Sequence, residues 1–331
     1  LVRFCNAVVR GVNERAKKEL GKTIKIMTFA YHYTKDAPVK YEDGKILPID
    51  DTVIADENLI MQFALFSNAA HDYFDPEQDE GIEKIMNEWR VIAKEFWFWA
   101  YDIAFNDYFA FYDSFKNIDA NVKGFKDYGI TYMCVQGSND SAKNWQCNAR
   151  AYAYRKIMNG SRLPASQLID EYLDGYYSVA ADDVRELINL FSSNYAERVS
   201  RGEDIRFTTF GNFSNGENNP YEMLVKAIKA IETGEKKITE RYDGKEREKY
   251  LKRLAGVKTT PLDILYLNYY YYFPQGNETD RAKAREAFVE TARFAEIDAA
   301  REHYTLKRYV EFTESEVKTE DKKSISQAAG E

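Results

Sequence analysis

The sequence predicts a parallel α/β region followed by an all-helical region. Between residues 23 and 145, short apolar runs alternate with amphipathic helical patterns, which is typical of strands buried on both faces of a parallel sheet. After Gly160 the apolar spacing is helical, and charged and small residues dominate from residue 313. We therefore expect an α/β domain over 1–160, a helical domain over 161–312 and a disordered tail over 313–331.

Four segments of the first region are the expected strands. Each is nearly continuous in apolar and aromatic residues and is followed by a polar loop. Four such strands with right-handed crossovers build either half of an eight-stranded barrel or a small open sheet, and the residues alone do not separate the two. The segments are 23–31 (TIKIMTFAY), 58–66 (NLIMQFALF), 95–101 (EFWFWAY) and 130–137 (ITYMCVQG).

Helical patterns account for most of the remaining chain. We expect Pro261 to bend or break the helix that contains it. The segment 205–213 (IRFTTFGNF) is compatible with a short strand, and 38–57 is expected to be a long loop. The expected helices are 2–20, 81–94, 118–127, 145–158, two within 163–195 separated near Gly175, 222–242, 246–272 and 280–303.

Composition narrows the classes of function. The net charge of −8 gives no basic footprint for nucleic acid, and no apolar run approaches the length of a membrane span. The three cysteines lack the spacing of a zinc site or a disulfide scaffold, and no nucleotide-binding, zinc-protease or α/β-hydrolase motif is present. We expect no cofactor. The 25 tyrosines include side chains suited to sugars, although most should fill the core.

Histidine and aspartate residues follow the expected strands, at the edge where parallel α/β folds bind ligands. His32 follows the first strand, His71 and Asp72 follow the second, and Asp102 follows the third. A histidine can transfer a proton, and glycoside hydrolysis needs two carboxylates. Asp102, His71 and Asp72 are therefore the candidate catalytic residues, with Asp102 expected at the mouth of the site. The alternative for each is a structural loop residue.

Aromatic and amide side chains at the same edge are candidate substrate contacts. Strand alternation puts His32 opposite Tyr31 and Tyr33, so the three share one pocket only if the strand has ended by Tyr31. The alternative is that the aromatic rings pack beneath the loops. The candidate substrate-binding residues are Tyr31, His32, Tyr33, Tyr101, Gln136 and Trp145.

Five ordered segments carry a family resemblance. They are AYHYT (30–34) followed by Ala37-Pro38, HDYFD (71–75), EWRVIAKEFWFWAYDIAFNDYF (88–109), YGITYMCVQGS (128–138) and LIDEYLDGYYSVAADDVRELINLF (168–191). In this order they resemble a bacterial domain-of-unknown-function family of polysaccharide-utilising organisms, related to the α-glucuronidase and β-hexosaminidase type of (β/α)8 glycoside hydrolase. The resemblance covers roughly residues 1–310. It implies that the four strands are the C-terminal half of a TIM-like barrel, followed by a helical domain.

The resemblance also implies a glycan or sugar ligand and a secreted or surface location in a bacterium. Related glycosidases carry an acidic pair near the end of strand four, which would precede Leu1, so the missing N-terminal half of the same protein is an implied partner. We therefore expect a fragment of a glycan-processing protein that recognises or hydrolyses carbohydrate. The alternatives are a non-catalytic glycan-binding module and, less favoured, a metal-dependent hydrolase, for which two separated histidines are weak evidence.

A four-stranded piece of a barrel should leave part of its sheet uncovered. Its edges carry unpaired backbone groups, and its concave face has no partner strands opposite. We therefore expect Phe29, Phe63 and Trp99 to be partly uncovered on that face.

Overall fold

The computed structural model describes residues 1–64, 74, 81–138, 143–202 and 213–315 of the chain. These residues divide into two compact units. The first unit comprises Leu1–Asp102 and Ser114–Gln136, and the second comprises Ile103–Asp113 and the chain from Gly137 onward. The change of composition near residue 160 therefore falls inside the second unit.

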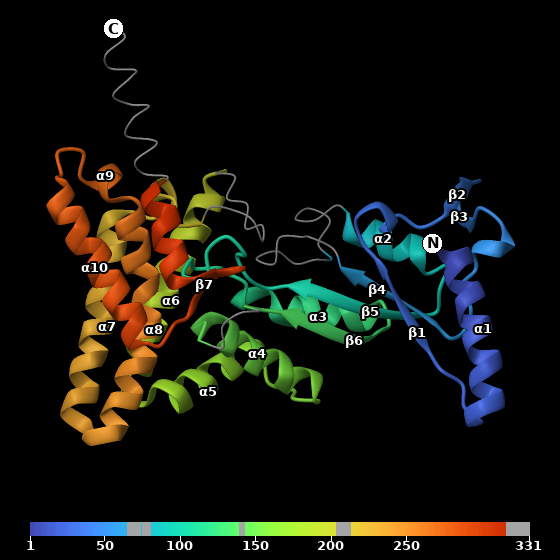
Figure 1. The fold of residues 1–331 in the computed structure, drawn as a ribbon, viewed down its shortest axis with the longest axis horizontal. Helices are drawn as coiled ribbons and strands as arrows, with labels where there is room; N and C mark the ends of the chain where they lie inside the picture. Colours follow the sequence, from blue (N-terminus) through green and yellow to red (C-terminus); the bar gives the residue numbers. More distant parts are fainter. Residues whose placement is uncertain (65–73, 75–80, 139–142, 203–212, 316–331) are drawn as a thin grey trace, which may run out of the picture. The chain divides into compact units, whose positions relative to one another are not determined.

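The first unit is built on a four-stranded parallel sheet with the strand order β1-β4-β5-β6 (Figure 1). The strands follow one another across the sheet in the same order as along the chain. All four expected strands are confirmed. Their bounds are β1 (Ile26–Ala30), β4 (Leu59–Ala64), β5 (Glu95–Tyr101) and β6 (Ile130–Gln136).

Helices cover one face of this sheet. The ring of Phe98 on β5 lies 4.4 Å from that of Phe125 on α3, and the ring of Phe63 on β4 lies 6.1 Å from that of Trp89 on α2. The register pairs Phe63 with Phe98, so both point to the covered face and both are buried. The expectation that Phe63 is uncovered is therefore wrong. The helices of this unit are α1 (Val2–Leu20), α2 (Ile82–Trp89) and α3 (Ile118–Asp127).

The expected loop 38–57 contains a hairpin that we did not predict from the sequence. Its strands β2 (Val39–Glu42) and β3 (Lys45–Pro48) pair antiparallel around Asp43 and Gly44. Both turn residues have a positive φ, of 48° and 73°, as Asp-Gly hairpin turns require. Short 3-10 turns complete the unit: η1 (His32–Thr34), η2 (Asp51–Val53) and η3 (Phe115–Asn117).

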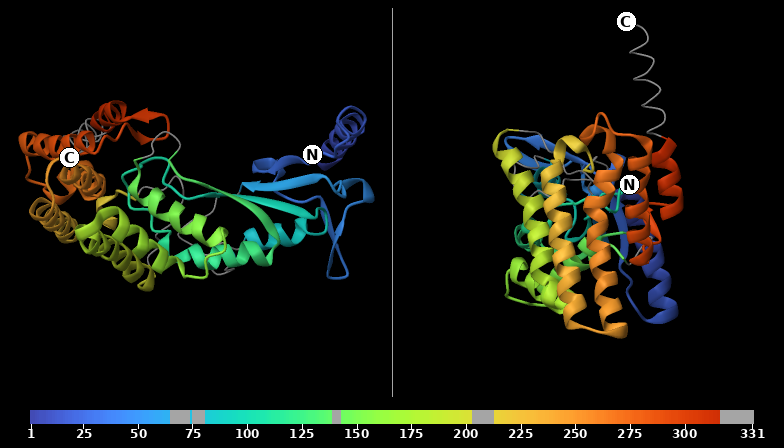
Figure 2. Two further views of the ribbon diagram at one scale, coloured as in Figure 1. Left: turned by 90° about the horizontal axis from the view of Figure 1, so that it is seen from below. Right: turned by 90° about the vertical axis from the view of Figure 1, so that its left-hand side faces the viewer.

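The second unit is mainly helical, as expected. Its long helices stand side by side in Figure 2, and α8 packs against both α7 and α10. The helices of this unit are α4 (Trp145–Met158), α5 (Ala165–Tyr177), α6 (Ala181–Ser200), α7 (Tyr221–Arg241), α8 (Gly244–Leu267), the short α9 (Tyr269–Tyr272) and α10 (Glu278–Phe294). They are accompanied by η4 (Ser178–Ala180), η5 (Gly216–Asn218), the hairpin β7 (Ala299–Arg301) and β8 (Tyr304–Thr305), and a helical stretch over 306–315.

Some boundaries differ from the expected ones. Helix α5 ends at Tyr177 rather than near Gly175, because Ser178 takes a left-handed φ of 55°. Helix α8 continues through Pro261 to Leu267, within a buried stretch whose packing outweighs the missing donor. The expected tail begins inside the helical stretch 306–315, and 316–331 lie outside the described residues. So does 205–212 of the ambiguous segment.

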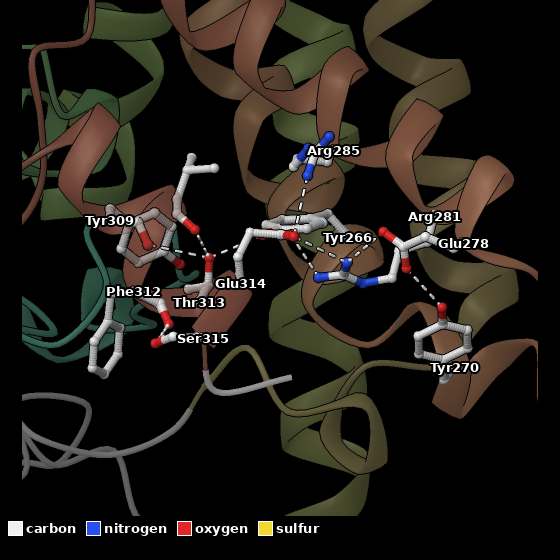
Figure 3. A network of polar contacts seen from close by, with 11 residues as sticks. Tyr266, Tyr270, Glu278, Arg281, Arg285, Tyr309, Phe312, Thr313, Glu314 and Ser315 are labelled. Atoms are coloured by element: carbon white, nitrogen blue, oxygen red, sulfur yellow. Dashed lines mark hydrogen bonds and ion pairs between the residues drawn. The ribbon is translucent and has the colours of Figure 1, made fainter. Parts of the chain in front are cut away.

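A buried ion pair fastens the last helical stretch of the second unit (Figure 3). Arg281, which is 2% exposed, donates to Oε1 of Glu314 at 2.7 Å, and the Tyr266 hydroxyl donates to the same atom at 2.7 Å. Arg285 contacts Oε2 at 3.1 Å. Burial opposes ionisation of Glu314, but the hydrogen bonds from Arg281 and Tyr266 outweigh it and lower the pKa of this carboxyl.

Candidate functional site

The carboxyl ends of the parallel strands bring three of the expected site residues together. Tyr101 and Gln136 are register partners at the ends of β5 and β6, and the backbone N–H of Asp102 donates to the Gln136 carbonyl at 2.9 Å. Tyr101, Asp102 and Gln136 therefore share one edge of the sheet. His71 and Asp72, which the sequence predicts for the same edge, lie outside the described residues.

Asp102 is buried rather than open at the mouth of a site. It is 3% exposed, and the hydroxyl of Ser114 donates a hydrogen bond to its Oδ1. The expectation of an exposed carboxylate fails because the chain returns at Ser114 and covers the end of β5. Removing this carboxylate should disturb folding as well as ligand contacts, since a buried polar group that loses its partner is destabilising.

The segment Tyr31-His32-Tyr33 follows β1 as a 3-10 turn. The strand ends at Ala30, so strand alternation does not apply to these three side chains. His32 takes a positive φ of 47°, and its ring lies edge-on to that of Tyr31 at 4.0 Å. His32 and Tyr33 are exposed, and Tyr31 is half-buried. The turn therefore presents one imidazole and two phenol rings beyond the end of β1.

The sheet face opposite α2 and α3 carries four aromatic side chains, Phe29, Trp97, Trp99 and Tyr132, which we call the aromatic face. The rings of Trp97 and Tyr132 are 4.8 Å apart, and those of Phe29 and Trp99 are 6.0 Å apart. Phe29 is 38% exposed, Tyr132 is 51% exposed, and both tryptophans are half-buried. A face that apolar rings share with solvent is typical of binding surfaces.

The aromatic face continues into the polar edge of the sheet. The indole N–H of Trp99 donates to Oε1 of Gln136 at 2.7 Å. Ala64 lies beside Trp99 in the register, and its small side chain leaves room for the contact between Trp99 and Phe29. Gln136 thus links the aromatic face to Asp102, whose N–H bonds the Gln136 carbonyl.

We did not predict Trp97 and Tyr132 of the aromatic face from the sequence. The aromatic residues predicted for the site were Tyr31, Tyr33, Tyr101 and Trp145. The signal was present in strand alternation, because EFWFWAY puts Trp97 and Trp99 on one face and ITYMCVQ puts Tyr132 beside Trp97.

Trp145 belongs to the second unit. It is 5% exposed at the start of α4, and its indole N–H donates to the Thr260 hydroxyl at 3.2 Å. The side chain is thus largely enclosed in the core of that unit and offers little ring surface for stacking on a sugar.

A pair of buried carboxyls lies in the core of the second unit. Asp263 on α8 shares a hydrogen bond with Asp107 and accepts one from the Tyr309 hydroxyl at 3.1 Å. Asp107 accepts hydrogen bonds from the Ser214 hydroxyl and from the backbone N–H of Phe109 at 2.8 Å. Burial, followed by the charge of Asp107, raises the pKa of Asp263 well above its usual range.

The Asp107–Asp263 pair has a structural role in this protein. Perturbed carboxyls often mark catalytic sites, but Asp263 is 0% exposed and no substrate can reach it without rearrangement. The hydrogen bonds of Asp107 instead tie its own loop to α8 and to Ser214. The sequence signal was an aspartate inside the apolar run PLDILYL.

Metal binding gains no support from the described residues. Within them, no group of three His, Cys, Asp or Glu side chains could hold a metal ion. The metal-dependent alternative would use His32, His71, Asp72 and Asp102, of which His71 and Asp72 lie outside those residues, so it stays a prediction. No helix in the described part of the chain combines the length and apolarity needed to cross a membrane.

A protein-family model matches the first part of the chain. The model of a domain of unknown function, DUF4838, matches residues 1–189, a span that holds the whole first unit together with α4, α5 and the first part of α6. No curated protein matches the chain, and no solved structure does.

Proposed function

The chain belongs to the DUF4838 family, and we propose that its first unit recognises a glycan on the aromatic face of its sheet. The observation that carries the proposal is that face itself: four aromatic rings on β1, β5 and β6, partly exposed and adjoining the polar edge at Gln136. A sugar ring has an apolar C–H face and a rim of hydroxyls, so it needs this combination of flat apolar rings and nearby polar groups.

We also propose that the sheet is part of a (β/α)8 barrel. The strand order follows the chain order in one direction, whereas doubly wound sheets reverse direction at a switch point. With right-handed crossovers, a one-directional order places the helices on one face only, and α2 and α3 both cover the face opposite the aromatic rings. In a barrel of this kind the uncovered face is the interior and ligands bind at the carboxyl ends of the strands.

The described residues support glycan recognition better than glycan hydrolysis. Cleavage of a glycosidic bond needs two carboxyl groups about 5–10 Å apart with access to the sugar. Asp102 is a buried carboxylate bonded to Ser114, and Asp72 and His71 lie outside the described residues. The alternative proposal is a glycoside hydrolase related to the α-glucuronidase and β-hexosaminidase type. In that case the second of the two catalytic carboxylates would come from residues other than those described at this site. An extracytoplasmic location in a bacterium is part of the same proposal.

The proposal is tested by glycan binding with a matched pair of tyrosine variants. Tyr132→Ala removes a 51% exposed ring from the aromatic face, and Tyr271→Ala removes a 58% exposed ring from α9 in the second unit. Binding to a panel of plant and bacterial polysaccharides is measured by affinity electrophoresis. We expect Tyr132→Ala to weaken retention by a bound polysaccharide about tenfold, the effect of losing one well-packed aromatic contact, and Tyr271→Ala to leave it unchanged. Equal retention of both variants would refute the assignment of the aromatic face.

A further inference from the structure

The second unit contains a cavity that plays no part in the proposed glycan site. Its volume is about 470 Å³, within the range of about 300–1,000 Å³ typical of small-molecule sites. It is lined by residues of α4, α5 and the first half of α8, by Lys143 just before α4, and by Ala295 and Glu296 just after α10. The lining residues are Lys143, Trp145, Asn148, Tyr176, Tyr177, Lys245, Glu248, Lys249, Lys252, Arg253, Gly256, Ala295 and Glu296.

The lining of this cavity is cationic although the chain as a whole is acidic. Five of its side chains are lysine or arginine and two are glutamate, which leaves three positive charges, while the chain carries a net charge of −8. Lys245 and Arg253 have no carboxylate partner within the described part of the chain. A concave surface of one sign concentrates its field and attracts ligands of the opposite sign.

Arg253 is held in place without a carboxylate. One of its terminal N–H groups donates to the Tyr176 carbonyl at 2.7 Å, and the guanidinium lies 3.9 Å from the centroid of the Tyr176 ring. The side chain is half-buried. A guanidinium has five N–H donors in a planar fork that matches carboxylate and phosphate oxygens. Arg253 therefore keeps donors for an anion in a fixed orientation.

Glu296 organises the lysines at the rim of the cavity. Its carboxylate contacts Lys252 at 2.6 Å and Lys143 at 3.2 Å, and hydrogen bonds from Lys252 and then Lys143 lower the pKa of Glu296. Glu296 adopts a left-handed φ of 60° just after α10, a position where glycine is preferred because other residues lose about 1–2 kcal/mol there. The residue whose side chain joins the two lysines thus adopts a backbone conformation that carries a penalty.

Gly256 lines the cavity and has no side chain to fill it. It is buried in the middle of α8, where glycine destabilises a helix by about 1 kcal/mol relative to alanine. No packing contact requires the missing side chain, because a Cβ built at this position meets no atom within 4 Å. The residue also borders a second cavity of about 10 Å³. A Cβ added here would therefore enter open space rather than collide with neighbours.

We propose that this cavity binds a small organic polyanion that carries phosphate or carboxylate groups. The fixed Arg253 and the unpaired Lys245 supply the charges, Lys249 adds a third cation, and the volume exceeds what a single inorganic ion needs. Both phosphate esters and polycarboxylates have this chemistry, and the probes below distinguish them.

The test is isothermal titration of the full chain with four probes: glucose 6-phosphate, citrate, inorganic phosphate and uncharged glucose. We expect glucose 6-phosphate or citrate to bind more tightly than inorganic phosphate, glucose not to bind, and added salt to weaken binding of the anions. The preference between glucose 6-phosphate and citrate identifies the phosphate-ester or polycarboxylate class. Absence of binding heat for all three anions would overturn the proposal, as would equal binding of glucose.

Variants locate the site. Lys245→Gln with Lys249→Gln should raise the Kd of the bound anion about fivefold, the size expected of two exposed charges. The matched control, Lys226→Gln with Lys229→Gln, changes two exposed lysines of α7 away from the cavity and should leave Kd unchanged. Gly256→Leu should abolish binding while the melting temperature stays the same or rises. Anion binding that survives Gly256→Leu in a folded protein contradicts the assignment of this cavity.

Discussion

The two units differ in what they leave exposed and what they bury. The first unit leaves aromatic rings half-exposed on one face of its sheet, whereas the second unit buries charged and titratable groups such as Arg281 and Asp263. The buried groups are satisfied by one another and hold helices and loops together. Strongly shifted pKa values therefore mark structural contacts in this protein, and the partly exposed aromatic rings of the first unit form the ligand surface that we propose.

Breaking the buried ion pair should have the largest effect on stability. Arg281→Leu removes a buried cation and leaves the half-buried Glu314 with only Arg285 as its cation, so it should lower the free energy of unfolding by about 3–5 kcal/mol, measured by urea denaturation. The control Lys236→Leu breaks an exposed pair with Glu240 and should change it by less than about 0.5 kcal/mol. Equal losses in the two variants would show that Arg281 is not a structural anchor.

The two faces of β5 should respond differently to truncation. Phe98 is 0% exposed against α3, so Phe98→Ala should cost about 3–5 kcal/mol of unfolding free energy. Trp97, the residue before Phe98, points to the opposite, half-exposed aromatic face, and Trp97→Ala should cost about 1–2 kcal/mol. Chemical denaturation of both variants measures the two losses of unfolding free energy. A loss for Trp97→Ala as large as that for Phe98→Ala would mean that the aromatic face is part of the hydrophobic core.

The Asp107–Asp263 pair predicts a smaller effect that depends on pH. The folded state holds the proton of Asp263 above the usual pKa of 3.8, whereas the unfolded chain releases it near that value. The pair's contribution to stability is therefore complete below about pH 4 and is lost as the pH rises through the raised pKa. Asp263→Asn cannot ionise, so its melting temperature should fall less than that of the original protein between pH 5 and pH 9.

Asp243→Asn, which changes an exposed aspartate at the start of the same helix, is the control and should retain the original pH dependence. A pH profile for Asp263→Asn that parallels the unmodified chain would show that the pair does not titrate as described.

The sheet and the helices could be read from the sequence because continuous apolar runs and helical spacing reflect burial directly. EFWFWAY matches β5 from end to end. The hairpin β2–β3 was missed although Asp43-Gly44 is a recognised hairpin turn, because its strands are short and mostly exposed. The expected helix 280–303 ends at Phe294, and its last part forms β7, because strands of three and two residues are too short to give a periodic signal.

The candidate site was predicted in part. The position after each strand located Tyr101, Asp102 and Gln136 at one edge, since parallel strands end together. It could not reveal that Ser114 returns to cover Asp102, because that contact joins residues separated in the chain by a loop of the other unit. The cationic cavity was equally hidden, because its residues come from α4, α5, α8 and the chain next to α4 and α10, and share no motif.

Tryptophan quenching tests the central claim that the aromatic face is open to a ligand. Of the four tryptophans, Trp89 and Trp145 are buried at 1% and 5% exposure, whereas Trp97 and Trp99 are half-buried on that face. Iodide should therefore quench one fraction of the fluorescence, and that fraction should disappear in the Trp97→Phe/Trp99→Phe variant. We expect a polysaccharide retained in the affinity assay to protect this fraction from iodide. Undiminished quenching at saturating polysaccharide would contradict the account.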